Sequence, residues 1–178
     1  MKFKSLTTAG LLVFAVAVSA GPAAKAGLAL DDGIITAKIK SALVQEPATK
    51  AREVKVKTLN GVVQLSGFVA SAEAKQRAEV IAGTTEGVTD VRNNLQIRAA
   101  ATTRGEKFDD STLATKVKAA LIDNKATKAR EIKVSSLRGV VQLSGFVTSI
   151  DEKVAASKVA ANVRGVKNVE NDLEIHSL

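Results

Sequence analysis

The sequence predicts an α+β protein built from two tandem αββαβ domains, each a two-layer sandwich in which two helices cover one face of a three-stranded mixed sheet. Residues 31–97 align without a gap on residues 109–175, 78 positions later, and 34 of these 67 positions are identical. A unit of about 67 residues is close to the smallest size at which one hydrophobic core suffices. Within each unit, helical and strand spacings follow one another in the order helix, strand, strand, helix, strand. Two helices on one side of a sheet give the two-layer arrangement.

The first helix of each copy is predicted over 32–45 and 110–123. Asp31 and Asp109 precede these segments, and an aspartate at this position can accept a hydrogen bond from a free backbone N–H of the first turn. Apolar residues then recur on one helical face, at Ile35, Ile39, Ala42 and Leu43 and, in the second copy, at Leu113, Val117, Ala120 and Leu121.

A β-hairpin follows. Residues 54–59 alternate apolar and polar side chains, which is the period of a half-buried strand. Asn60-Gly61 is a strong signal for a two-residue turn, because both central residues of a type I′ turn need a positive φ. The return strand is 62–69, and Arg138-Gly139 is the weaker turn signal of the second copy.

The second helix and third strand complete each unit. Ser71 and Ser149 stand where the helices begin, and Ser149 forms a capping box with Glu152. The helix of the first copy ends at Gly87, and alternating residues up to Ile97 predict the third strand.

The ends of the chain predict export. Residues 1–26 combine a basic start with an apolar run from Leu11 to Val18, which is too short to span a bilayer. We interpret them as a secretory signal peptide cut after Ala26, with Ala20 as the alternative. Domain 1 is then predicted over 30–98, a linker over 99–107 and domain 2 over 108–176. The mature chain has no later apolar run long enough to cross a membrane, so we expect a periplasmic protein.

Composition narrows the classes of function. The chain has no cysteine, which excludes disulfides, thiolate metal sites, a cysteine nucleophile and a lipid-modified N-terminal cysteine. Without residues 1–26 the charge is 23 − 18 = +5, which favours anionic partners. The chain has no Trp or Tyr, so it has little with which to stack on bases, and we expect no nucleic-acid partner.

No motif indicates an enzyme, a metal site or a cofactor. The repeated glycines lack phosphate-loop spacing and are assigned structural roles: Gly61, Gly67, Gly87, Gly139, Gly145 and Gly165. Ser66 and Ser144 would need a positioned base to act as nucleophiles, and the chain has a single histidine, His176. The paired aspartates at 31–32 and 109–110 are explained as helix caps. We therefore expect no catalytic residues, no metal and no cofactor.

The hairpin register predicts a surface for a partner. If Asn60-Gly61 is a two-residue turn, Val56 and Leu65 point toward the helices, whereas Lys55 and Lys57 point to the other face of the sheet. We call the sheet face without helices the outer face. The candidate binding residues are the cations and apolar side chains of this face and its neighbouring loops: Lys50, Arg52, Lys55, Lys57, Leu59, Val62, Lys125, Lys128, Arg130, Lys133, Leu137 and Val140. Alternatively, the two outer faces pack on each other or on a partner subunit.

Two motifs occur together, twice and in order: Gly-Val-Val-x-Leu-x-Gly at 61–67 and 139–145, then Gly-Val-x-x-Val-x-Asn-x-Leu-x-Ile at 87–97 and 165–175. With them the chain resembles the BON domain, a family named for bacterial osmotically inducible and nodulation proteins, over almost all of its mature length. The resemblance implies the αββαβ fold and a non-enzymatic periplasmic protein of osmotic or envelope stress. It implies binding to anionic phospholipid or the envelope surface, and as an alternative a holdase-type chaperone for unfolded envelope proteins.

Overall fold

The computed structural model describes residues 31–47, 49, 53–98 and 104–176, with side chains from 109 onward in the last range. The predicted signal peptide, Lys50, Arg52 and most of the predicted linker lie outside the described residues.

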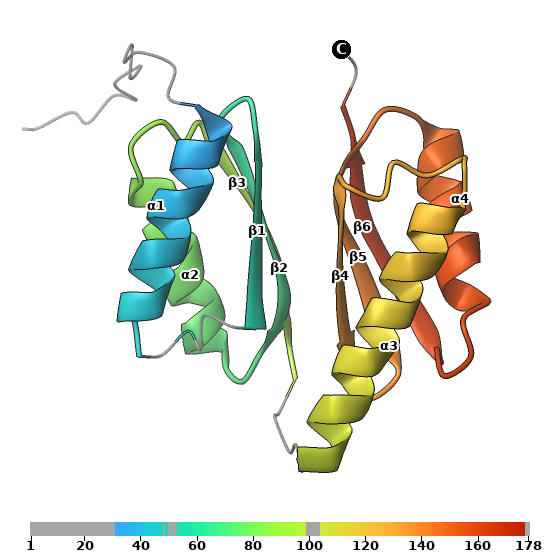
Figure 1. The fold of residues 1–178 in the computed structure, drawn as a ribbon. Coiled ribbons are helices and arrows are strands. Elements are labelled where there is room, and N and C mark those ends of the chain that lie inside the picture. Colours follow the sequence, from blue (N-terminus) through green and yellow to red (C-terminus); the bar gives the residue numbers. More distant parts are fainter. Residues whose placement is uncertain (1–30, 48, 50–52, 99–103, 177–178) are drawn as a thin grey trace, which may run out of the picture.

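Both repeats fold as predicted, with helix, strand, strand, helix and strand in that order (Figure 1). Domain 1 contains α1 (Asp32–Gln45), β1 (Val54–Leu59), β2 (Val62–Val69), α2 (Ala72–Thr84) and β3 (Asp90–Ile97). Domain 2 contains α3 (Arg104–Asp123), β4 (Ile132–Leu137), β5 (Val140–Val147), α4 (Ile150–Ala161) and β6 (Asn168–Ile175). In each sheet the middle strand, β2 or β5, is antiparallel to the strand before it and parallel to the strand after it. The sheets are therefore mixed, and the predicted fold class is confirmed.

The predicted hairpin register is also confirmed. Leu59 lies opposite Val62, and Val56 lies opposite Leu65. Asn60 and Gly61 have φ values of 51° and 77°, as a type I′ turn requires. The Asp32 carboxylate accepts hydrogen bonds from the backbone N–H groups of Asn60 at 2.7 Å and of Gly61 at 2.9 Å. These bonds tie the start of α1 to the turn.

Each domain has its own apolar core between its helices and one sheet face. In domain 1 the α1 residues Ile35, Ile39 and Leu43 are buried against Val56 and Leu65 of the sheet. Domain 2 repeats this with its own core cluster: Leu113, Val117, Leu121, Ala129, Ile132, Val141, Leu143, Val147, Ala156, Ala160 and Leu173. The alternation in the strands thus leaves a second, outer face on each sheet.

Two helix ends differ from their predictions. Helix α2 ends at Thr84, before the predicted end at Gly87. Helix α3 begins at Arg104, inside the predicted linker, and not at 110. The residues ahead of Asp109 include Arg, Glu and Lys, which favour helix, so the helix continues into the linker. Asp109 therefore lies inside α3, whereas Asp31 caps α1 as predicted, with its side chain accepting from the Gly33 N–H.

Candidate functional site

The outer faces of the two sheets face each other across the middle of the molecule (Figure 1). Strand β2 contacts both β4 and β5, and β1 contacts β4. The structure thus has the arrangement that the sequence offered as an alternative, in which the two outer faces pack on one another. Because the helices already cover the opposite faces, both sheets are enclosed on two sides.

Identical side chains from the two domains meet at the centre of this interface. The Ser66 and Ser144 hydroxyl oxygens lie 2.6 Å apart. The Gln64 Oε1 atom accepts from the Gly145 N–H at 2.5 Å, and the Gln142 Oε1 atom accepts from the Gly67 N–H at 2.7 Å. Each bond recurs with the two domains exchanged, so the interface has approximate two-fold symmetry.

The same two glutamines also donate across the interface. The Gln64 Nε2 atom donates to the Asp172 carbonyl at 2.6 Å, and the Gln142 Nε2 atom donates to the Asn94 carbonyl at 2.6 Å. Both glutamine residues are 1 % exposed, and a buried amide is costly unless it is hydrogen-bonded. Apart from a bond from the Gln142 Nε2 atom to the Asp172 carboxylate of its own domain, at 2.7 Å, the other domain supplies the bonds that make these two polar side chains tolerable on a buried face.

Glycine is required beside these glutamines. Gly67 and Gly145 have φ values of 117° and 125°, which favour glycine. A Cβ atom at either position would lie 2.0 Å from a backbone carbonyl oxygen, that of Glu53 or of Glu131. The backbone N–H groups of Gly67 and Gly145 donate to the glutamine side chain of the opposite domain. The repeated motif therefore carries the contact between domains.

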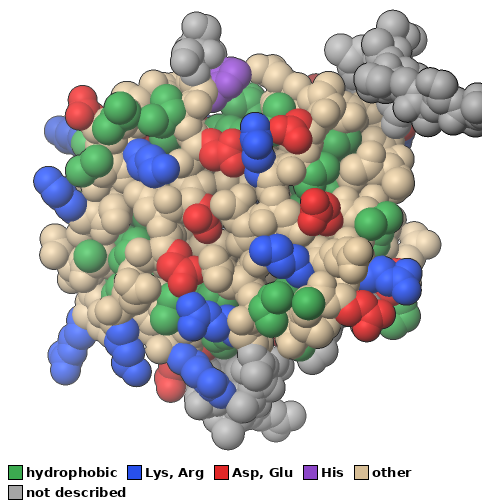
Figure 2. Space-filling model, turned by 180° about the vertical axis from the view of Figure 1, so that it is seen from behind, with side chains coloured by type: hydrophobic (Ala, Val, Ile, Leu, Met, Phe, Trp, Pro, Cys, Tyr) green, Lys and Arg blue, Asp and Glu red, His purple; other side chains and the backbone are tan. Residues whose placement is uncertain are grey.

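Charged side chains along β3 and β6 break the symmetry of the interface. The Arg98 guanidinium lies 2.9 Å from the Glu170 carboxylate, and that of Arg92 lies 3.8 Å from Glu174. Figure 2 shows acidic and basic side chains interleaved along the middle of the molecule, on the side away from the viewer in Figure 1. Exposed ion pairs add little stability, but complementary charges select partners. Position 92 is Arg in domain 1, and the equivalent position 170 is Glu in domain 2. These charges therefore favour pairing of domain 1 with domain 2 over pairing of two identical domains.

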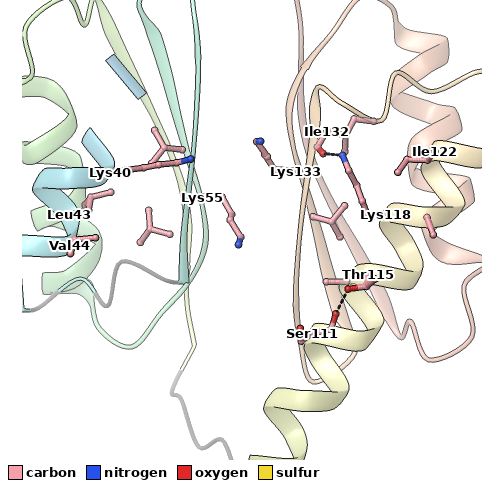
Figure 3. A pocket seen from close by; sticks show the side chains of 15 residues that line it. Lys40, Leu43, Val44, Lys55, Ser111, Thr115, Lys118, Ile122, Ile132 and Lys133 are labelled. Carbon is pink, nitrogen blue, oxygen red and sulfur yellow. Dashed lines mark hydrogen bonds between the residues drawn. The ribbon is translucent and has the colours of Figure 1, made fainter. Parts of the chain in front are cut away.

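A groove of about 850 Å³ lies at the opposite edge of the interface, bordered by α1 and β1 of domain 1 and by α3 and β4 of domain 2 (Figure 3). We call it the lysine groove. It is lined by Lys40, Leu43, Val44, Val54, Lys55, Val56, Ser111, Ala114, Thr115, Lys118, Ala119, Ile122, Ile132, Lys133 and Val134. Its lining is largely duplicated, because Lys40 and Lys118, Lys55 and Lys133, and Val44 and Ile122 are equivalent positions.

The lysine groove is strongly cationic. Lys57 forms an ion pair with Glu131, but within the described residues no carboxylate pairs with Lys40, Lys55 or Lys133. Burial lowers the pKa of Lys133, and the nearby lysines 57, 40 and 55 lower it further, against an opposing effect of Glu131. Figure 3 shows Lys40 and Lys133 reaching toward each other from opposite domains.

Lys118 is held differently. Its Nζ atom donates to the backbone carbonyls of Ile132, at 2.6 Å, and of Ala129. Burial lowers the pKa of this lysine, and the Lys133 charge lowers it further. Lys118 therefore adds positive charge to the groove from a fixed position.

The structure brings together only some of the candidate residues. Lys55 and Lys133 line the lysine groove, and Lys57 lies beside it. Three candidates are exposed in the loop between α3 and β4: Lys125, Lys128 and Arg130. The half-buried apolar pairs lie at the two hairpin turns, at opposite ends of the molecule (Figure 1): Leu59 with Val62, and Leu137 with Val140.

Sequence reasoning missed the contribution of the helices to this groove. Lys40 and Lys118 lie off the core-facing stripes of α1 and α3, and Val44 and Ile122 are 73 % and 63 % exposed. A lysine followed four residues later by an exposed aliphatic residue, at the same place in both copies, was the available signal.

The described residues show little that resembles a reaction centre. Ser66 contacts Ser144, while the His176 ring lies 3.2 Å from the Asn60 amide, so in this part of the chain neither serine is bonded to a base. No group of three or more potential metal ligands occurs among the described residues. No described helix combines the length and the apolarity needed to span a bilayer.

These features define a class of protein: two αββαβ domains that pair through their sheets and form a cationic groove beside the interface. The BON domain matches residues 31–99 and 109–177, and the chain belongs to the BON-domain family.

Three relatives share most of this chain. Osmotically-inducible protein Y of Escherichia coli K12 is 41 % identical over 84 % of this chain and 75 % of its own length. Outer membrane lipoprotein DolP of Haemophilus influenzae is 33 % identical over 80 % of this chain and 74 % of its own. The 21 kDa hemolysin of Actinobacillus pleuropneumoniae is 32 % identical over 81 % and 74 %.

A solved structure is more distant. The C-terminal domain of CdsD, a type III secretion protein of Chlamydia trachomatis, aligns over 83 % of this chain and 68 % of its own, with 15 % identity and a TM-score of 0.34. At this TM-score the likeness says nothing about function.

Proposed function

We propose that this chain is a non-enzymatic envelope-stress protein of the periplasm that associates reversibly with anionic phospholipid surfaces. Similarity to a relative named for osmotic induction and to an outer membrane lipoprotein supports the role and the compartment. The proposal includes the secretory signal peptide that the sequence predicts over residues 1–26. The observation that carries it is the convergence of Lys40, Lys55 and Lys133 on one groove, with no carboxylate of the described residues paired to them.

The lysine groove suits the boundary of an anionic bilayer. Each lysine near such a surface contributes about 1 kcal/mol, and Val44 and Ile122 add exposed apolar area at the same site. A few lysines of this kind give binding that is useful yet reversible. Because the attraction is electrostatic, salt should weaken it.

Vesicle co-sedimentation tests the proposal. The chain is mixed with phosphatidylcholine vesicles with and without phosphatidylglycerol, at low and high salt. We expect binding only with phosphatidylglycerol and mainly at low salt. The variant K40Q/K55Q/K133Q should bind about a hundredfold more weakly, from about 1 kcal/mol for each of three lysines.

A charge-matched variant provides the control. K158Q/R164Q/K167Q also removes three exposed cations, at positions that do not line the lysine groove, and should lose much less binding. Equal binding to both kinds of vesicle, or an equal loss in the two variants, would contradict the proposal.

The exposed apolar residues of the lysine groove favour one alternative, a holdase-type chaperone for unfolded envelope proteins. Val44 and Ile122 are each more than half exposed and line the same groove, and an exposed apolar patch can mark a site for another protein chain. Suppression of a client's aggregation that persists at high salt, and is lost in V44S/I122S, would favour the chaperone over the lipid-binding protein.

A further inference from the structure

We infer that the lysine groove holds one phospholipid molecule, with its phosphate between Lys55 and Lys133 and its acyl part along the apolar lining. This inference rests on the proposed function and makes it more specific. A protein attracted to a membrane surface needs only exposed cations, whereas this groove has the form of a site for a single molecule.

The register places the two central lysines. Lys55 lies opposite Ser66 on paired strands, and Lys133 lies opposite Ser144. Because the two serine hydroxyls lie 2.6 Å apart across the interface, the two lysines flank the boundary between the domains on the side of the groove. Figure 3 shows both side chains extending into the space between the domains. Ammonium groups from two sides can bind different oxygens of one phosphate.

The lining on either side of these lysines suits an acyl chain. Val44 and Ile122, which are equivalent residues and are 73 % and 63 % exposed, line the groove together with the half-buried Val134. The lining residues Leu43, Val56 and Ile132 belong to the domain cores and are at most 1 % exposed. The volume of about 850 Å³ lies within the range of pockets for small ligands, roughly 300–1,000 Å³. A flat membrane contact would not need such a recess.

The electrostatics of the groove are incomplete without an anion. Lys55 and Lys133 have no ion-pair partner among the described residues, and the single Glu131 is engaged with Lys57. Like charges held together and partly buried raise the free energy of the charged state. A phosphate between them relieves this repulsion. Accordingly, burial and the neighbouring lysines 57 and 40 lower the pKa of Lys133 in the free chain.

A monomeric lipid tests the inference. Dihexanoyl phosphatidylglycerol, kept below its micelle concentration, is titrated into the chain by calorimetry, and dihexanoyl phosphatidylcholine and inorganic phosphate are titrated in parallel. We expect saturable binding of one phosphatidylglycerol per chain and much weaker binding of the other two. K55Q/K133Q should weaken it by about 30-fold, and K158Q/K167Q should leave it nearly unchanged.

A second variant separates the acyl contact from the charge. V44S/I122S should weaken phosphatidylglycerol binding by about tenfold and leave phosphate binding unaltered. Equal affinity for phosphate and for the lipid would overturn the inference in favour of a simple anion site. Vesicle association that persists without saturable binding of the monomer would also overturn it, while leaving the proposed function intact.

Discussion

Replacing both Ser66 and Ser144 by cysteine should join the two domains covalently. The hydroxyl oxygens are 2.6 Å apart, so the sulfur atoms need only a small approach to reach the S–S bond length of about 2.05 Å. The natural chain has no cysteine, so no other disulfide competes. Formation of this bond in S66C/S144C tests directly whether the two outer faces meet.

The expected gain in stability follows from the loop that the bond closes. The two positions are 78 residues apart, for which the chain-entropy relation gives about 4.5 kcal/mol, and strain in such variants commonly leaves about 2–4 kcal/mol. With a urea dependence of about 1–3 kcal/mol per molar, the oxidised chain should unfold about 1–2 M higher than the reduced chain. Free-thiol titration and urea unfolding, with and without reductant, measure both effects.

A mismatched pair provides the control. Ser41 is exposed on α1, on the helix side of its sheet, so S41C/S144C should keep its thiols under the same conditions. If S66C/S144C also stayed reduced while folded, the face-to-face packing would be refuted, and with it the lysine groove that depends on it.

Further substitutions probe the backbone, the buried amides and the lysines. Gly67→Ala should cost at least about 1–3 kcal/mol, because its Cβ atom would lie 2.0 Å from a carbonyl oxygen at a φ of 117°. Gly83→Ala, in helix α2 with 3.9 Å of space, should instead stabilise by about 0.5–1 kcal/mol, and urea unfolding compares the two. Gln64→Ala and Gln142→Ala should each cost about 1–3 kcal/mol and couple in a double-mutant cycle. The pKa of Lys133 is lowered in the folded chain by burial and by lysine neighbours. Between this lowered pKa and the ordinary lysine pKa, the unfolded chain binds more protons than the folded chain. The free energy of unfolding should therefore increase with pH there, with a smaller slope in K133Q.

Each of these expectations has a clear counter-result. An alanine at position 67 that is as well tolerated as one at 83 would show that the chain does not need a positive φ there. Strictly additive costs for the two glutamines would mean that they do not share one interface. An unchanged pH slope in K133Q would show that this lysine is solvated like any surface lysine.

The hairpin shows how far the sequence reaches. Asn60-Gly61 fixes a two-residue turn, and the turn together with side-chain alternation fixes which of Val56 and Lys55 faces the helices. These are local constraints, carried by residues close together in the chain. The start of helix α3 at Arg104 shows the limit of such reasoning. Asp109 is a good N-cap residue by itself, but the helix-favouring residues ahead of it extend the helix past that position.

The candidate site shows what local patterns leave open. Lys55 and Lys133 could be assigned to the outer face, yet the helix residues Lys40 and Lys118 join them only because the domains pair. Likewise Gln64 is an ordinary polar residue on an outer face until Gly145 comes within hydrogen-bond distance.

From the sequence alone come the duplication, the order of elements, the strand register and the division of each sheet into an inner and an outer face, because all of these follow from spacing along a single segment. The tertiary structure alone decides that the outer faces cover each other, that their glutamines and glycines are bonded across the boundary, and that lysines of both copies share one groove. The physical reason is that contacts between residues 78 positions apart leave no periodic trace in either segment. They depend instead on the complementary shapes and charges of two surfaces, which exist only once both domains have folded.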